Sequence, residues 1–224
     1  MDTKPLLCMV VVVIATVHAQ IAPTQIPLKW HWSQFPNPQN EFGRCGRNKP
    51  SYICDPNHLI SYKGANAIDR LINQTLTDST CPCGAQSCIR SKRSGYQIAV
   101  AIVPEFYTSY NGSNPDRLLL ETRRFAYGIY SRRWSFGVCG EWVLLFYTQQ
   151  QNIVYTLTGR LARSTLNDAL LEQITLDARH FFAAGPQRNI TQGLLQMVED
   201  FRNVFLTRYQ RRPFVRAARL YRRT

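Results

Sequence analysis

The chain has 224 residues, 45% of them hydrophobic, and a formal net charge of +13 at pH 7. This length suits one domain with extensions rather than two domains, and it is ample to bury a core without covalent cross-links. Beyond the N-terminus no stretch approaches the roughly 18 to 20 consecutive apolar residues of a membrane span, which excludes an ordinary spanning helix there.

Residues 1–19 have the pattern of a secretory signal peptide. Lys4 precedes an apolar run from Leu6 to Val17, and Ala19 is a small residue at a position that signal peptidase reads. We expect cleavage before Gln20, which leaves a secreted chain of about 205 residues.

The next segment, residues 20–44, is rich in proline and tryptophan. Prolines at this density oppose regular structure, so we expect the aromatic side chains to pack onto the domain. We call this segment the strap. Its aromatic residues are Trp30, Trp32, Phe35 and Phe42.

The predicted domain spans residues 45–207 and begins with a turn at Asp55-Pro56-Asn57. Apolar residues at spacings of three and four predict a helix over 64–76. The strand predicted over 96–103 has Ile98, Val100 and Ile102 on one face and alanines and a valine on the other. Asn114 and Pro115 then form a cap and first turn for a helix that extends to about 134.

Trp142 to Tyr147 is an unbroken apolar run, which is typical of a central strand covered on both faces. A polar turn and an alternating segment, Ile153 to Thr158, predict its hairpin partner. The alternative is a buried helix through 142–157. Strand, helix and strand in this order predict a parallel βαβ unit with a right-handed crossover. The expected fold is therefore α/β, with three layers and a mixed sheet flanked by helices.

Two further helices are expected. Thr165 and Asp168 resemble a capping box that opens a helix ending at Gly185. The last helix is predicted over 190–212, before Pro213 interrupts it.

Six cysteines follow the signal peptide, and an even number in a secreted chain predicts disulfides, with the pairing left open. Zinc is the alternative for Cys81, Cys83 and Cys88, disfavoured by the oxidising compartment and the lack of a nearby histidine. Cys81 and Cys83 should have different partners, because a bridge across one proline would be strained. The six are Cys45, Cys54, Cys81, Cys83, Cys88 and Cys139.

Residues 208–224 form a basic tail without an acidic residue. Such a run attracts acidic glycans or lipid head groups, which we favour over nucleic acid for an exported chain. The alternative, which we favour for a secreted protein, is an exposed tail without a dedicated partner. The candidate polyanion-binding residues are Arg208, Arg211, Arg212, Arg216, Arg219, Arg222 and Arg223. Sequons predict glycosylation at Asn73, Asn111 and Asn189.

Catalytic patterns are sparse: the sequence has no phosphate-binding loop, no His-Glu-x-x-His and no nucleophile elbow. Asp55 is the most suggestive acid, since a turn carboxylate can bind calcium. Glu141 precedes the central strand. Ligands of open α/β sheets bind at the carboxyl ends of strands, and Glu141 lies at the other end of its own strand.

The order of these motifs resembles the TPM domain and, more narrowly, the modulator-of-levamisole-receptor family, from about Trp30 to Phe205. The motifs are Cys45-Gly46, Cys54-Asp55-Pro56, the strand GYQIAVAIV, the helix around Phe125 to Trp134, and VCGEWVLLFY. The resemblance implies an α/β fold and an auxiliary role at the extracellular part of acetylcholine-gated channels.

More distant TPM relatives bind calcium or are described as acid phosphatases, through an aspartate in the first motif and an Asp-Asn-Gly before the central strand. Asp55 matches the first position, but Gly140, Glu141 and Trp142 replace the second motif. The leading interpretation is a secreted, non-enzymatic binding protein. The alternatives are a calcium-binding or phosphatase domain that uses Asp55 and Glu141, and a polyanion binder.

Overall fold

The structure is a computed structural model that describes residues 26–84, 86–88, 95–110, 112, 114–186 and 188–210. The predicted signal peptide and most of the basic tail lie outside these residues. The strands are β1 (Lys29–Trp30), β2 (Ile53–Cys54), β3 (Gln97–Val103), β4 (Glu105–Phe106), β5 (Trp142–Thr148) and β6 (Ile153–Thr158). The helices are α1 (Tyr62–Asp78), α3 (Pro115–Gly128), α4 (Arg160–Thr165), α5 (Asp168–Phe182) and α6 (Ile190–Phe205). Three short helices complete the fold: η1 (Trp32–Gln34), η2 (Phe42–Cys45) and the π-helix η3 (Ile129–Trp134), which continues α3.

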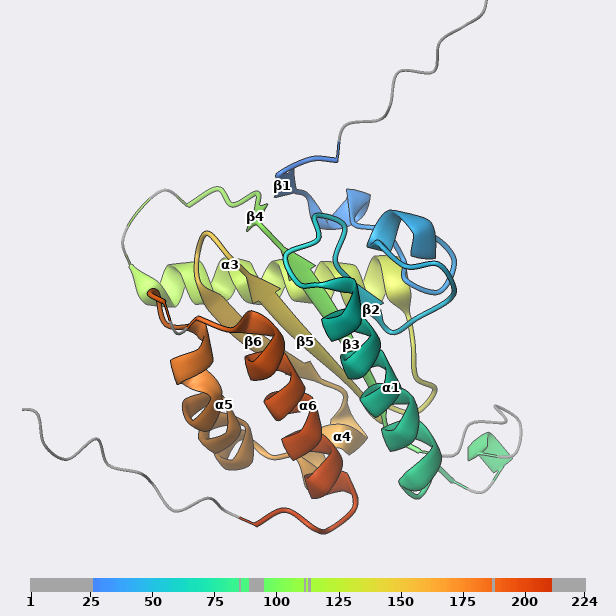
Figure 1. Ribbon diagram of the computed structural model, residues 1–224. Helices are drawn as coiled ribbons and strands as arrows, with labels where there is room; N and C mark the ends of the chain where they lie inside the picture. The colour runs from blue at the N-terminus through green and yellow to red at the C-terminus, as the bar shows by residue number, and fades with distance from the viewer. Residues whose placement is uncertain are drawn as a thin grey trace, which may run out of the picture.

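The main sheet has the order β2-β3-β5-β6 (Figure 1). Its first three strands are parallel and β6 is antiparallel to β5. The predicted central strand and its hairpin partner are therefore confirmed, and the alternative of a buried helix is wrong. Every residue of β5 is buried, because helices cover both faces of the sheet.

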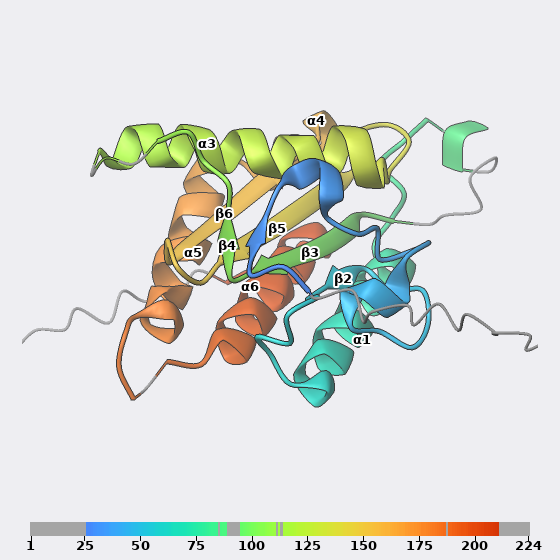
Figure 2. The ribbon, with the colours of Figure 1, turned by 90° about the horizontal axis from the view of Figure 1, so that it is seen from above.

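The alternation of side chains along β3 divides the core into two layers. Ile98, Val100 and Ile102 face the cluster built with α1, α5 and α6. The alanines and Val103 on the opposite face pack in the cluster that contains Phe125 of α3. The views in Figures 1 and 2 show α3 on one side of the sheet and the other long helices on the opposite side. The predicted three-layer α/β fold is confirmed.

The two parallel crossovers differ in hand. The connection from β3 through α3 to β5 is right-handed, as predicted (Figure 1). The sheet order continues in the same direction from β2 to β3, but α1 covers the opposite face, so that crossover has the rarer left hand. The chain therefore leaves the carboxyl ends of β2 and β3 toward opposite faces. Such a divergence opens the crevice in which α/β proteins bind ligands.

The predicted start of the first C-terminal helix is wrong. Thr165 is the last residue of α4, and Asn167 caps α5 by accepting the Leu170 amide at 3.0 Å. The residues after β6 form the separate short helix α4, whose first-turn amides of Leu161 and Ala162 donate to the carbonyl of Gly140 at 2.9 Å. Thr165 therefore belongs to α4 and does not cap α5.

The last helix is also shorter than predicted and ends at Phe205 instead of 212. Thr207 adopts a left-handed conformation with φ +56°. The amide of Arg208 donates to the carbonyl of Asn203, and that of Thr207 to Val204. This is the Schellman pattern of helix termination, formed here without the glycine that usually marks it.

The strap belongs to the core, as the sequence predicts. Trp30 and Phe35 are almost fully buried, and β1 pairs in parallel with β4 as a separate two-stranded sheet. Buried aromatic side chains of this size each contribute a few kcal/mol to stability, about 1.5–3 for a Phe-sized side chain. The strap is thus held by packing as well as by backbone pairing.

Candidate functional site

Asp55 lies directly after β2, at the carboxyl edge of the sheet where the crevice is expected. Its side chain is buried, and each carboxylate oxygen accepts one backbone amide of the following turn: Oδ1 from Leu59 at 3.0 Å and Oδ2 from Ile60 at 2.9 Å. The carboxylate therefore acts as a staple for this turn. A calcium ion needs six or more oxygen ligands, and among the described residues Asp55 belongs to no group of three or more side chains placed to hold a metal ion.

Burial raises the pKa of the Asp55 carboxyl above its ordinary value. The amides of Ile60 and Leu59 and the charge of His58 act in the opposite direction but do not cancel the cost of burial. His58 itself is exposed. The site is therefore a buried turn carboxylate held by amides, with no cluster of acids around it in the described chain.

The cysteine-glycine and cysteine-aspartate motifs form one clamp around this turn. Cys45 and Cys54 are joined by a disulfide. Gly46 has φ +70°, and a Cβ there would lie 2.8 Å from His58 Cε1 and 3.0 Å from the carbonyl oxygen of Asp55. Only glycine satisfies both the conformation and the close approach. The motif that suggested a ligand site thus builds a rigid corner.

The strap closes the crevice beside Asp55. The indole Nε1 of Trp30 donates to Asn57 Oδ1 at 2.8 Å, and Asn57 Nδ2 donates to the carbonyl of Pro27 at 2.9 Å. Figure 2, which looks down on the carboxyl ends of the strands, shows the blue segment with η1 lying across them. A hollow of about 380 Å³ remains on the outer side, lined in part by Trp30, Pro56 and His58. The position that binds ligands in related sheets is occupied by the chain itself.

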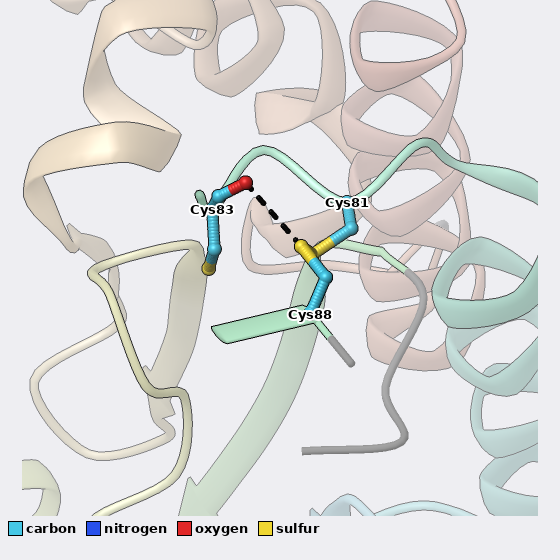
Figure 3. A group of neighbouring side chains, drawn as sticks. All are labelled: Cys81, Cys83 and Cys88. Atoms are coloured by element: carbon cyan, nitrogen blue, oxygen red, sulfur yellow. Dashed lines mark hydrogen bonds between the residues drawn. A yellow bond between two sulfur atoms is a disulfide. The ribbon is translucent and has the colours of Figure 1, made fainter. Parts of the chain in front are cut away.

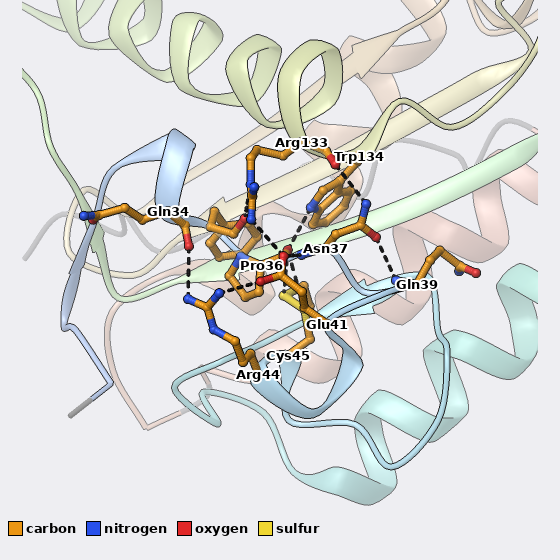
Figure 4. Close-up of polar contacts among 11 residues, drawn as sticks. Gln34, Pro36, Asn37, Gln39, Glu41, Arg44, Cys45, Arg133 and Trp134 are labelled. Atoms are coloured by element: carbon orange, nitrogen blue, oxygen red, sulfur yellow. Dashed lines mark hydrogen bonds and ion pairs between the residues drawn. A yellow bond between two sulfur atoms is a disulfide. The ribbon is translucent and has the colours of Figure 1, made fainter. Parts of the chain in front are cut away.

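Glu41 fastens the strap to η3 (Figure 4). Its carboxylate accepts a hydrogen bond from Arg133 of η3 at 2.8 Å and one from Arg44 of η2, the short helix that Glu41 precedes. Burial alone would raise the Glu41 pKa, but the Asn37 amide and these two arginines lower it below its usual value. Because η3 continues α3, this ion pair links the strap to the helix behind the sheet.

A second set of contacts runs alongside. The indole of Trp134 donates to the carbonyl of Pro36 at 2.8 Å, and Asn37 Nδ2 donates to the carbonyl of Arg133 at 2.9 Å. Arg133 Nε donates in turn to the carbonyl of Phe35 at 3.1 Å. The strap carbonyls are therefore satisfied by η3 side chains, as buried backbone groups require.

Glu141 lies at the opposite, amino edge of the sheet. It is 2% exposed, and its carboxylate accepts the amides of Val138 and Cys139 at 2.9 Å. Its neighbour Trp142 stacks on Tyr130 with ring centroids 3.5 Å apart. Glu141 is therefore also a turn staple, in a corner filled by aromatic rings.

Asp55 and Glu141 are not brought together. Asp55 follows Cys54, which aligns with Ala101 and through it with Phe146 of β5, whereas Glu141 precedes the first residue of β5. At about 3.3 Å per residue the two acids are separated by roughly 20 Å along the strands. One cation cannot use both.

The six cysteines form three disulfides: Cys45–Cys54, Cys81–Cys88 and Cys83–Cys139. Cys81 and Cys83 have different partners, as predicted. In Figure 3 the Cys88 sulfur lies beside the Cys83 carbonyl oxygen, 3.3 Å away. Zinc requires thiolates, so the paired sulfurs leave no zinc site in this cluster. The Cys83–Cys139 bridge ties the long loop after α1 to the corner that holds Glu141.

The remaining predicted positions lie on the surface or outside the described residues. Asn73 on α1 and Asn189 at the cap of α6 are exposed, which suits glycosylation. Asn111 is not among the described residues. Arg208 is exposed just after α6, and the other candidate polyanion-binding arginines, 211, 212, 216, 219, 222 and 223, lie outside the described chain.

Sequence reasoning missed the residues that lock the strap, above all Asn57 and Arg133. Asn57 was recognised only as a turn former, and Arg133 as part of a helix. The only signal was the density of aromatic residues in the strap, which predicts packing but names no polar partner.

Comparisons with known proteins agree with this fold. The family model described as "Modulator of levamisole receptor-1" matches residues 30–152. The solution NMR structure of the N-terminal domain of a protein from P. gingivalis is similar, with a TM-score of 0.51 and 19% identity over 78% of this chain and 90% of that one. No curated protein sequence matches the chain. Among the described helices, none has both the length and the apolar character needed to cross a bilayer.

Proposed function

Because the chain belongs to the modulator of levamisole receptor-1 family, we propose that it is a secreted, non-catalytic auxiliary protein that binds the extracellular part of an acetylcholine-gated channel. The match covers residues 30–44 of the strap, the Asp55 turn and the sheet up to the turn between β5 and β6. The channel is proposed from the family and from the resemblance of the motifs.

The proposal that the protein is not an enzyme rests on one observation: the strap closes the carboxyl edge of the main sheet. The hydrogen bond between the Trp30 indole and Asn57 connects the strap to the turn after β2. The two carboxylate oxygens of Asp55 accept backbone amides of the same turn. Catalysis by a bound metal needs several oxygen ligands and an open coordination position. A rigid domain whose usual ligand crevice is filled by its own chain is better suited to presenting surfaces to a partner.

The extracellular location has two supports. All six cysteines outside the predicted signal peptide are paired, and such disulfides persist in oxidising compartments. The predicted signal peptide points to the same compartment. The predicted glycosylation sites Asn73 and Asn189 are exposed, so attached glycans would not disturb the core.

The proposal is tested by affinity capture with the purified protein. The immobilised protein is incubated with detergent-solubilised membranes from cells that express a levamisole-sensitive acetylcholine receptor, and bound subunits are identified by mass spectrometry. Receptor subunits should be retained and then displaced by the free protein. Retention of no receptor subunit, with the protein shown to be folded by circular dichroism, would refute the proposal.

A further inference from the structure

The strand β6 leaves one edge of the main sheet open. It is last in the sheet order, and among the described residues only β5 pairs with it. The amide of Gly159 donates to the carbonyl of Trp142 at 2.8 Å, which makes this pair a hydrogen-bonded one. Hydrogen-bonded and free pairs alternate in antiparallel ladders. The backbone groups of Val154, Thr156 and Thr158 therefore point away from β5, toward the open edge.

Natural proteins usually protect such edges with charged residues, proline, a bulge or a very short strand. The other edge strand, β2, is only two residues long and is tied by a disulfide. By contrast β6 has six residues, IVYTLT, with no charge and no proline. A strand of this composition is a template for pairing with another chain.

A groove runs along this edge. A hollow of about 350 Å³ is lined by four consecutive residues of β6, Tyr155 to Thr158. Successive side chains of a strand point to opposite faces, so a hollow that touches four in a row must follow the strand's edge. Its walls come from both layers: Arg123 of α3 on one side, and Arg163 of α4 with Leu171 of α5 on the other.

The α3 side of the groove also has an apolar shelf. An adjoining hollow of about 270 Å³ is lined by Leu119, Leu120, Arg123 and Tyr155, together with Asp116. Leu119 and Leu120 are 48% and 44% exposed, which is unusual for leucines on a helix that packs against a sheet. Exposed apolar side chains that gather beside a groove are typical of a binding surface.

Charge favours one kind of occupant. Of the charged residues that line the two hollows, Arg163 is paired with Asp168, whereas Arg123 and Asp116 form no salt bridge with any described residue. A second copy of this chain would also carry a net charge of +13, so two copies repel each other. Like charges at an interface disfavour association, whereas an acidic partner is attracted.

We propose that the open edge of β6 binds an extended, acidic segment of a partner protein as an additional strand. The main chain of that segment would pair with Val154, Thr156 and Thr158, an acidic side chain would meet Arg123, and an apolar side chain would cover Leu119 and Leu120. This is strand addition, in which backbone bonds provide affinity and flanking side chains provide specificity. The inference goes beyond the proposed function and does not depend on it, because it rests on the edge strand alone.

The test uses two synthetic peptides and the full purified protein. One peptide alternates valine and threonine between flanking glutamates, and the other has lysines in place of the glutamates. The acidic peptide should bind, slow hydrogen exchange at the amides of Thr156 and Thr158, and bind about tenfold or more tightly than the lysine peptide. Equal binding of the two peptides, or no slowing of exchange in β6, would overturn the proposal.

Two variants locate the binding. Thr156→Pro removes an outward amide while leaving the bonds to β5, and edge strands tolerate proline at such positions; it should abolish binding. Arg123→Glu should reverse the preference between the two peptides. Arg117→Glu, on the same helix but outside both hollows, is the matched control and should change affinity by less than about threefold. If the protein alone forms a dimer that Thr156→Pro disrupts, the occupant is a second copy and the proposal is wrong.

Discussion

Replacing Trp30 by alanine tests whether the strap is part of the folded domain. The indole is 2% exposed, packs edge-on against Phe35 at 5.4 Å, and donates to Asn57 at 2.8 Å. Truncating a buried tryptophan costs about 3–5 kcal/mol, which includes the cavity left behind. For a domain of this size, each kcal/mol lowers Tm by about 2–4 °C, so Trp30→Ala should lower it by roughly 6–20 °C.

Chemical and thermal unfolding of three variants separates the contributions. Trp30→Phe keeps a ring but removes the donor to Asn57, so it should cost about 1 kcal/mol for the hydrogen bond in addition to a smaller packing loss. Leu28→Ala lies two residues away at a side chain that is 73% exposed, and it should change the free energy of unfolding by less than about 0.5 kcal/mol. If Trp30→Ala cost less than about 1 kcal/mol, the strap would not close the crevice in solution.

Three further predictions concern the acid of the turn, the metal and the tail. Burial raises the folded-state pKa of Asp55 above its ordinary value of 3.8, so protonation of this side chain favours the folded state. The free energy of unfolding, measured relative to that of Asp55→Asn, should therefore increase as the pH falls through the folded pKa toward 3.8. A decrease over that range would contradict the reasoning. Millimolar calcium should leave Tm unchanged, and hydrolysis of a phosphate ester with calcium, magnesium or manganese should stay at background; turnover lost in both Asp55→Asn and Glu141→Gln would restore the metal interpretation. Deleting residues 213–224, which removes four of the seven candidate arginines, should lower Tm by no more than a few degrees and lower the salt concentration that elutes the protein from heparin; an unchanged elution would show that these four arginines do not bind polyanions.

The three long strands of the main sheet were predictable because each carries its own burial pattern, whereas the two-residue strands β1, β2 and β4 are too short to carry one. The alternation along Gln97–Val103 and the unbroken apolar run of Trp142–Thr148 reflect how each strand is covered, and the structure places both at the centre. The helix ends were less predictable. Helix α6 is terminated by Thr207, which adopts the left-handed conformation usually found at glycine or asparagine. Because the residue is a threonine, no residue type in the sequence indicated the helix end.

The relation between the two predicted acids depended on topology rather than on residue type. The position of Glu141 before its strand indicated the wrong edge for a ligand, and the register confirms that it lies far from Asp55. What no local pattern could reveal was the left-handed crossover through α1. That crossover opens a crevice between β2 and β3, and the strap then fills it with Trp30.

The most direct test of the proposed function is the current through a levamisole-sensitive acetylcholine receptor, recorded with and without this protein co-expressed in the same cells. The account predicts a reproducible change in the response to acetylcholine or levamisole, a change that Trp30→Ala weakens through the strap and that Leu28→Ala leaves intact. Identical currents in the presence of abundant, secreted, folded protein would contradict a role as an auxiliary protein of these channels.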